Sequence, residues 1–567
     1  MKLIVERLVI ESLVDTFPDQ AHLLAQPRFS NRVEVGLDTL KPDALAHLHD
    51  LVLKTGGTVI RGQEEQLSNL VRVFQDDGPK FAPDDLEELA GALAIFLVDH
   101  CIRGWLFRMN PGGKPEPYLV TRLDYTPPGD EEAGRVIIEL KANNRGKTHV
   151  ENLLIRSKDL RGLTILGTLA AKGWLMEDEA LLKSFDQEMV LYFDWRSRYG
   201  QQFSATGTGI FAEDPTANRR DTDWARKSVI VLSSTGSAAR LVNDEELLGD
   251  RVLGAETSGF FLDKLVKKAE KQNCFDMAVD EALKNAKSRI PKGAFTEMPV
   301  HPLILMFHLE LHHHVWVHVD DIKPYQYHPE LKQKLVLPPE QTDLIDILTA
   351  EMNTLMADIV EGKSGGTTVM CAGPPGVGKT LTAEVYSEII QRPLYRVHSG
   401  QLGLDVATME TALKDALTRA QRWGAVMLID EADVYIKRRQ DNLTMNAVVG
   451  VFLRVLEYFN GLLFLTTNRV DDIDEAIVSR CIALIKYHSP SADDRRKIWG
   501  VMAEQFALDL EPGLIDMLVT QFPDTSGRDI KGLAKLVSKF CSQKNVPPSI
   551  EIFRRCAIFR ALDVPPM

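Results

Sequence analysis

The sequence predicts an α/β fold for its C-terminal part, a parallel sheet followed by a helical lid, preceded by α+β N-terminal domains. Three observations support this prediction. The stretch "GPPGVGKT" at 373–380 stands between an apolar run and a helical pattern, and a second apolar run ends in two carboxylates at 430–431. Further upstream, turn-rich connectors separate strand-like runs from residue 104 onward, which is typical of a β-meander.

The length of the chain and its net charge limit the number of domains and the kinds of partner that it can have. The chain has 567 residues, enough for about three to four domains. Its formal net charge is −14. Because phosphate contacts need a basic face, this balance makes nucleic acid an unlikely partner without excluding a local basic patch.

No run of about 20 uncharged apolar residues occurs, so the sequence predicts no membrane span. Charged residues interrupt the apolar N-terminal stretch "MKLIVERLVIESLVDTF", which argues against a secretory signal. The six cysteines form no CxxC pair and are expected to be reduced and buried. These features predict a cytoplasmic protein.

Residues 1–103 are predicted to be mostly helical. Segments 43–57 and 82–104 carry apolar residues at helical spacing and end in glycine. Residues 104–325 are predicted as an α+β domain that recruits a client. It contains the meander and two helices, within 159–174 and 177–195.

The segment "FHLELHHHVWVHVDD" at 307–321 alternates strictly. Phe307 and Val315 fall on one parity, and His308, His314 and His318 on the other. Such alternation predicts a half-buried strand or hairpin. Histidines two residues apart share a face, so the polar side is either a metal site or a solvated face.

The chain enters a new α/β unit, predicted over 330–488, through a proline pair, a long helix and a glycine-rich break within 335–366. Residues 489–567 are predicted as the helical lid and C-terminus. In the α/β unit, "TTVMCAGPPGVGKTLTAEVYSEII" is a strand, then a GxxxxGK[ST] loop, then a helix.

This loop in this context predicts a phosphate-binding site. Glycines let backbone N–H groups turn toward phosphates, and the helix that begins near Lys379 points its positive end at them. Lys379 can reach the β- and γ-phosphates, and Thr380 can ligate Mg²⁺. The predicted nucleotide-binding residues are Gly373, Pro374, Pro375, Gly376, Val377, Gly378, Lys379, Thr380, Leu381 and Asp430.

The run "AVMLIDEADV" predicts a buried parallel strand whose C-terminal end carries Asp430 and Glu431. Asp430 would hold Mg²⁺ together with Thr380, directly or through water, and Glu431 would orient the attacking water. Paired with the phosphate loop, this pattern indicates an enzyme that hydrolyses ATP with Mg²⁺.

With these motifs, residues of about 330–560 resemble the AAA family of ATPases. "GPPGVGKT" and "LIDEAD" resemble the family's Walker motifs, and "LLFLTTNRVDDIDEAIVSRC" resembles its sensor 1 strand and arginine-finger segment. "SGRDIKGLAK" at 526–535 resembles the sensor 2 region of the lid. The resemblance implies a P-loop NTPase AAA core. No named domain is recognised in residues 1–300.

The resemblance implies catalytic roles for Asn468, Arg480 and Arg528. Asn468 would help to position water, Arg480 would reach the nucleotide of a neighbouring subunit, and Arg528 would act from the lid. The finger segment is shorter than in many family members, and Arg469 lies close by, so the finger is assigned to Arg480 with Arg469 as the alternative.

A second departure concerns the loop between the two Walker motifs. Family members that pull on proteins usually present an aromatic residue there, whereas this chain has Leu402-Gly403-Leu404-Asp405-Val406-Ala407. An aliphatic side chain grips a polypeptide less well than an aromatic ring. Leu404 is the residue to test, and a plain connector is the alternative interpretation.

Two functions follow from these patterns. The first is a ring-shaped ATPase, a homo-hexamer that remodels a protein client recruited by its N-terminal region. The second is an ATP-gated assembly switch or scaffold, for example a defence or regulatory complex or a clamp-loader-like loader on nucleic acid. The client, the role of residues 1–325 and the number of subunits do not follow from the sequence.

Overall fold

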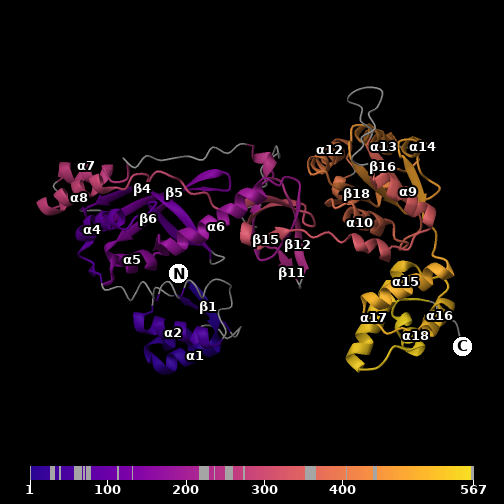
Figure 1. Ribbon diagram of the computed structural model, residues 1–567, viewed down its shortest axis with the longest axis horizontal. Coiled ribbons are helices and arrows are strands. Elements are labelled where there is room, and N and C mark those ends of the chain that lie inside the picture. The colour runs from indigo at the N-terminus through magenta and orange to yellow at the C-terminus, as the bar shows by residue number, and fades with distance from the viewer. Residues whose placement is uncertain are drawn as a thin grey trace.

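The structure of the chain is a computed structural model. It describes residues 2–25, 32–36, 40–55, 67, 71, 78–110, 114–129, 132–215, 229–234, 237–249, 260–272, 275–350, 366–403, 405–438 and 443–562. Along its long axis the elements of residues 2–196, with the helices within 260–289, lie toward one end, an antiparallel sheet lies in the middle, and the α/β core with its C-terminal helices occupies the other end (Figure 1).

The first elements combine two strands with helices. Strand β1 (Lys2–Glu6) pairs antiparallel with β2 (Arg32–Gly36), and α1 (Arg7–Thr16) packs against α2 (Pro42–Thr55). Alternate residues Leu3, Val5, Val33 and Val35 are fully buried. The helix predicted at 43–57 is confirmed as α2, and the strand pair is a feature that the helical prediction for 1–103 did not include.

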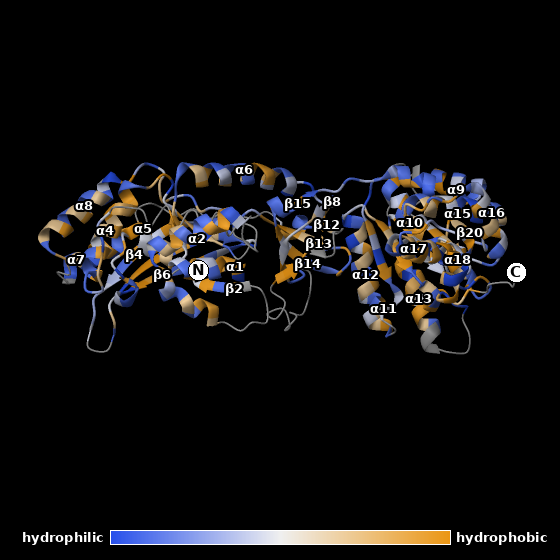
Figure 2. Ribbon diagram, turned by 90° about the horizontal axis from the view of Figure 1, so that it is seen from below, coloured by the Kyte–Doolittle hydropathy of each residue, from blue (hydrophilic) through white to orange (hydrophobic). Residues whose placement is uncertain are grey.

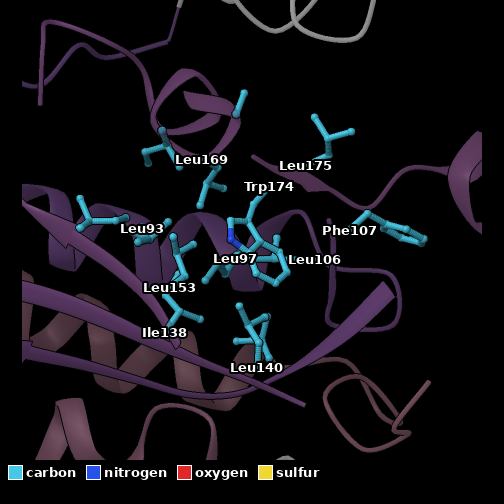
Figure 3. Close-up of a cluster of buried hydrophobic side chains, with 14 of the residues drawn as sticks. Leu93, Leu97, Leu106, Phe107, Ile138, Leu140, Leu153, Leu169, Trp174 and Leu175 are labelled. Atoms are coloured by element: carbon cyan, nitrogen blue, oxygen red, sulfur yellow. The ribbon is translucent and has the colours of Figure 1, made fainter. Parts of the chain in front are cut away.

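The predicted meander is confirmed. Strands follow one another antiparallel in the order β6-β5-β4-β3-β7. Their bounds are β3 Trp105–Met109, β4 Pro115–Thr126, β5 Arg135–Asn144, β6 Lys147–Arg156 and β7 Trp174–Met176. Helix α4 (Leu86–Asp99) packs its apolar residues onto this sheet, so the predicted boundary at 103 falls between elements that share one core (Figure 3).

Several helices surround the meander and join it to the next sheet. They are α5 (Ile165–Ala171), α6 (Glu179–Arg196), α7 (Asp263–Gln272) and α8 (Met277–Arg289). Helix α6 runs along one edge of the molecule (Figure 2). Its Phe185 contacts Trp105 edge-on at 5.4 Å, and Trp195 near its end contacts Phe203 of the next sheet at 5.9 Å, so α6 packs on both sheets.

The middle sheet is antiparallel, in the order β10-β9-β14-β13-β12-β8-β15 with β11 paired to β12. Its strands are β8 Gln202–Ala205, β9 Thr208–Ala212, β10 Val229–Val231, β11 Ser233–Ser234, β12 Ser237–Asn243, β13 Leu303–His308, β14 His313–His318 and β15 Ile322–Pro324. Residues 104–325, predicted as one domain, therefore contain two separate sheets among the described residues.

The histidine-rich segment forms the hairpin of β13 and β14, which confirms that part of the prediction. The prediction that Phe307 and Val315 lie on one apolar face is wrong. In the hairpin Phe307 pairs with His314, and Met306 pairs with Val315. Phe307 therefore shares a face with His314, and Val315 lies on the opposite face. Both faces are covered, and His308, His314 and His318 are buried, so the solvated polar face is also wrong.

The α/β core confirms the predicted parallel sheet. Its strands are β16 Thr367–Ala372, β17 Leu394–His398, β18 Val426–Asp430, β19 Leu462–Thr467 and β20 Ala483–Lys486, in the order β17-β18-β19-β16-β20. All of these pairs are parallel. Both faces are buried, which is why the strands read as continuous apolar runs.

Helices cover the two faces of this sheet. On one face, Val369 and Cys371 pack against α9 (Pro339–Ala350) and α10 (Lys379–Ile389). On the other, Met370 and Ala372 pack against α12 (Val406–Arg422) and α13 (Leu443–Leu456). At the C-terminal half of α10, the buried carboxylate of Glu388 accepts hydrogen bonds from the Tyr325 hydroxyl and the His328 N–H, both at 2.9 Å.

The helical C-terminus is confirmed by α15 (Ala492–Gln505), α16 (Pro512–Gln521), α17 (Gly527–Lys544) and α18 (Ile550–Ile558). They have their own core, in which Trp499 contacts Phe553 edge-on at 5.4 Å. Ser526 caps α17 by accepting from the Asp529 N–H, and this end of the helix faces the α/β core.

Candidate functional site

The glycine-rich loop between β16 and α10 adopts positive φ angles, which residues with a side chain disfavour. Gly376 has φ +83° and Gly378 has φ +101°. A Cβ at Gly376 would also lie 2.6 Å from the Ser526 hydroxyl. The first turn of α10 follows at once, so its free N–H groups and positive end face the space above the loop.

Lys379, the first residue of α10, is buried under this loop. Its ammonium donates to the carbonyls of Gly373 at 2.8 Å and Pro374 at 2.7 Å, and to the Asn468 side-chain oxygen at 3.0 Å. Burial lowers the pKa of Lys379, although the charges of Asp433 and Asp430 oppose the shift. The structure thus brings the predicted lysine and the predicted sensor asparagine together.

Asp430 ends β18 with its carboxylate buried. One oxygen accepts from the Thr380 hydroxyl at 3.0 Å and from the Thr466 hydroxyl, and the other accepts from Arg396. Burial alone would raise the pKa of Asp430, but the Thr466 hydrogen bond and the Arg396 charge hold it below its usual value. A carboxylate and a hydroxyl are the hard oxygen ligands that suit Mg²⁺, so Thr380 and Asp430 fit that ion.

Glu431 follows with its side chain exposed and its backbone in the left-handed region, φ +55° and ψ +50°. Its N–H donates to the Thr466 hydroxyl at 3.0 Å, which fixes this conformation. An outlier held in place by its surroundings is typical of functional positions. The turn directs the chain away from the sheet immediately after Asp430.

Asp433 and Arg396 are site residues that the sequence reasoning missed. Asp433 accepts from the Asn468 N–H at 3.1 Å and from the Thr467 hydroxyl, so it fixes the end of β19. Asp433 could have been predicted from the sequence, as the third acidic residue of "DEAD". Arg396 could not, because only the register of β17 and β18 brings it next to Asp430.

Arg480 does not lie beside Lys379 or Asp430 within the single chain. It follows α14 (Glu475–Val478), and its guanidinium forms an ion pair with Glu457 at the surface. The alternative finger, Arg469, pairs with Asp472 at 3.1 Å. Both arginines therefore have acidic partners of their own in this structure.

Arg528 lies at the start of α17, against the phosphate loop. Its backbone N–H donates to the Gly376 carbonyl at 3.1 Å, and its charge contributes to lowering the pKa of Lys379. The structure therefore brings Arg528 close to the loop.

The other predicted nucleotide-binding residues differ in exposure. Pro375 and Leu381 are exposed, while Pro374 and Val377 are partly buried.

The loop between the two motifs is anchored at its base. After α11 (Ser399–Leu402), Gly403 has φ +79° and Asp405 caps α12 by accepting from the Thr408 N–H at 3.1 Å. The buried Tyr435 hydroxyl, just past the acidic strand end, lies 2.6 Å from the Ser399 carbonyl and 2.9 Å from the Gly403 carbonyl. Leu404 itself lies outside the described residues.

The middle sheet contacts the α/β core through a buried carboxylate. Asp244 follows β12 and accepts from Arg422, the last residue of α12, at 2.9 and 2.8 Å, and from the Trp423 indole N–H at 2.7 Å. His314 lies 2.7 Å from the same carboxylate. Burial favours a raised pKa for Asp244, but His314 and Arg422 outweigh it and lower the pKa.

A partly buried polar group concerns the metal hypothesis for the histidines. Glu188, His318 and Asp320 offer ligand-type atoms within 4.8 Å of one another, the one such group among the described residues. The ammonium of Lys114 lies 2.9 Å from Nδ1 of His318, and the Asp320 N–H also points at Nδ1. Lys114 therefore already supplies a cation to this group, and no metal is assigned to it.

Comparison with known proteins places the site in a family. A family profile described as "ATPase family associated with various cellular activities (AAA)" matches residues 369–488. A 26S proteasome regulatory subunit homolog of Methanothermobacter marburgensis is 30% identical over 172 residues, 29% of this chain and 46% of that protein. The ATPase family AAA domain-containing protein 3A homolog of Drosophila melanogaster is 26% identical over 193 residues, 31% of this chain and 30% of that protein.

The chain thus spans less than half the length of these relatives. Among solved structures, the E. coli MS115-1 HORMA:CdnC:Trip13 complex aligns with 42% of this chain and 93% of the matched chain, at 18% identity and a TM-score of 0.34. In the described part of the chain, no helix is long and apolar enough to cross a membrane.

Proposed function

We propose, from the match of residues 369–488 to the AAA family of ATPases, that this chain binds ATP with Mg²⁺, hydrolyses it in a ring of identical subunits, and uses the cycle to remodel a protein client. One observation carries the proposal. The fold joins Lys379 to Asn468 at 3.0 Å and Thr380 to Asp430 at 3.0 Å at the carboxyl edge of one parallel sheet.

Each residue has a definite task in this proposal. The turned loop and the start of α10 bind the phosphates through backbone N–H groups, and Lys379 exchanges its carbonyl partners for phosphate oxygens. Thr380 and Asp430 would hold Mg²⁺, which neutralises charge on the phosphates when bound. Glu431, exposed beside Asp430, would orient the attacking water and accept its proton.

The position of Arg480 supports the proposed ring. It lies on the surface, away from the phosphate loop of its own chain, with Glu457 as its partner. An arginine is effective at a γ-phosphate only in direct contact with it. We therefore assign Arg480 to the nucleotide of the neighbouring subunit, which would complete each site at a subunit boundary. A hexamer is the proposed assembly.

Coupling to a client would use two contacts. Tyr435 ties the segment after the acidic strand to the base of the 399–405 loop, so a change at Asp430 and Glu431 can reach that loop. Asp244 ties the middle sheet to the other end of α12. Residues 1–325 would recruit the client, and the net charge of −14 favours a protein over nucleic acid.

The decisive experiment compares two variants of the full chain with a matched control. Lys379→Ala should lose ATP binding and hydrolysis, whereas Glu431→Gln should keep binding and lose about 10² to 10⁴-fold in hydrolysis rate. Lys414→Ala, an exposed lysine of α12, should behave as the native chain. Equal hydrolysis by the native chain and Lys379→Ala would refute the proposal.

The same variants separate remodelling from an ATP-gated switch. If the Glu431→Gln chain assembles and performs the cellular task as well as the native chain, ATP binding is sufficient and the switch is correct. If it captures a client but fails to process it, hydrolysis is needed and remodelling is supported. Stimulation of hydrolysis by DNA or RNA would instead indicate a nucleic-acid loader.

A further inference from the structure

An arginine that no motif predicts lies against the Mg²⁺ ligand of the site. Arg396 pairs with Leu428 across the parallel strands β17 and β18, and Asp430 lies two residues beyond Leu428. Because alternate residues of a strand share a face, Arg396 and Asp430 project to the same side of the sheet, the side covered by α10. The Arg396 guanidinium lies 2.5 Å from the second Asp430 oxygen.

Both oxygens of the Asp430 carboxylate therefore accept hydrogen bonds. Two hydroxyls donate to one oxygen, and Arg396 provides the full positive charge at the other. Without that charge, a carboxylate with 5% exposure would have only neutral donors. Burying a carboxylate without a counter-charge is costly, so the arginine stabilises the charged form of Asp430 while no cation is bound there.

Arg396 also has a second acidic neighbour. The other terminal nitrogen of its guanidinium lies 3.6 Å from the Glu384 carboxylate on α10. Burial raises the pKa of Glu384, while the positive charges of Arg396, Arg240 and Lys531 oppose that shift. The guanidinium thus lies between two carboxylates and can strengthen its contact with Glu384 without leaving its position on β17.

We propose that Arg396 is a positioning residue that holds Asp430 before the metal–nucleotide complex binds and then moves its guanidinium onto Glu384. Thr380 and Asp430 would hold the divalent ion, whose positive charge would then replace that of Arg396 as the counter-charge of Asp430. The pairing with Arg396 thus competes with the metal. Arg396 sets the Mg²⁺ concentration at which the site fills, and this inference rests on the proposed binding of ATP with Mg²⁺.

The test measures binding and not turnover. The full chain is mixed with an excess of a fluorescent ATP analogue in an EDTA-buffered solution. Free Mg²⁺ is then raised stepwise, and the bound fraction of the analogue is measured at each Mg²⁺ concentration. Arg396→Met removes the charge and keeps the length of the side chain, so the Mg²⁺ concentration at half-saturation should fall by about threefold or more. Arg396→Lys keeps the charge and should stay close to the native value. Arg454→Met, an exposed arginine of α13, is the matched control and should not shift it.

Glu384 provides an independent check. Glu384→Gln removes the alternative partner, so Arg396 stays on Asp430 and half-saturation should need more Mg²⁺. In an Arg396→Met background the same change should have little effect, because Glu384 acts through the arginine. Thermal unfolding of each variant without nucleotide reports whether it folds.

The outcomes separate the inference from the proposed function. No Mg²⁺-dependent binding by the native chain would remove the proposed function itself. Normal native binding with an unchanged or raised half-saturation in folded Arg396→Met would overturn only the inference. A Glu384→Gln effect that persists undiminished in the Arg396→Met background would also overturn it, since Glu384 would then act on the metal directly.

Discussion

Asp244 and Arg422, which are 178 residues apart in the sequence, join the middle sheet to helix α12 of the α/β core through two hydrogen bonds of 2.9 and 2.8 Å to a carboxylate with 1% exposure. Trp423 and His314 direct their nitrogens at the same carboxylate. Arg419, one turn earlier on α12, adds an ion pair to Asp214 at 3.0 Å. The end of α12 is therefore fixed to the middle sheet.

Removing this carboxylate should open the junction. Asp244→Ala leaves the partly buried Arg422 and the buried Trp423 N–H without this acceptor, a loss of about 3 kcal/mol. Amides of β12 and of the last turn of α12 should then exchange with solvent about 100-fold faster in hydrogen-exchange measurements. Asp194→Ala, at an exposed ion pair with Arg198, should change exchange little. Unchanged protection in Asp244→Ala would mean that apolar packing and the Arg419–Asp214 ion pair hold the junction without this carboxylate.

Stability should depend on pH through Glu188. Burial, with a smaller contribution from Asp320, raises the pKa of Glu188 to about 7. In the unfolded chain it titrates near 4.5, so between these values the folded state binds more protons and stability falls as pH rises. Glu188→Gln should remove this loss and gain on the order of 2 kcal/mol over the native chain between pH 5 and 8.

The check is a series of unfolding midpoints at several pH values. Glu179→Gln, an exposed position on the same helix, should give an offset that does not vary with pH. A Glu188→Gln curve parallel to that of the native chain would show that Glu188 is already charged at pH 5.

The phosphate loop should not tolerate a methyl group at Gly376. An alanine Cβ there would lie 2.6 Å from the Ser526 hydroxyl in a backbone region with φ +83°. We expect Gly376→Ala to push α17 away from the loop and to weaken binding of a fluorescent ATP analogue at least about tenfold. Gly450→Ala, in the helix α13 with nothing within 4 Å of the new methyl, should bind normally and be slightly more stable. Native-like binding by Gly376→Ala would show that the lid is not seated on the loop.

Tyr435 should anchor the 399–405 loop. Tyr435→Phe removes the hydroxyl and leaves the Ser399 and Gly403 carbonyls without that donor, a loss of about 1 kcal/mol. Amides around the start of α12 should exchange several-fold faster, about fivefold at this energy, with ATP binding retained. Tyr458→Phe, a 70% exposed tyrosine, is the control. Equal exchange in both variants would show that Asp405 and Gly403 suffice to fix the loop.

Sequence reasoning succeeded where a local pattern dictates a local structure. The GxxxxGK[ST] loop, the apolar run before Asp430 and the turns after residue 104 each specify a shape within a few residues. Prediction from the sequence failed where segments that are far apart in the sequence contact each other. The alternation over 307–321 predicts one apolar and one polar face, but the β13–β14 turn exchanges these faces, so His314 lies beside Phe307. Arg396 and Asp244 acquire their partners only through register and domain contact, which no local pattern contains.

Glu388 has a consequence for how this protein can be dissected. Helix α10 begins at Lys379 and carries Glu388 near its other end, about 14 Å away at the rise of an α-helix. Glu388 has 8% exposure, and its oxygens accept from Tyr325 and from the His328 N–H, upstream of the α/β core. A chain shortened to begin at residue 335 would lose both donors and leave a buried carboxylate on the helix that binds the phosphates. The ATPase unit studied in isolation would therefore differ from the native chain in nucleotide affinity, even with every motif residue intact.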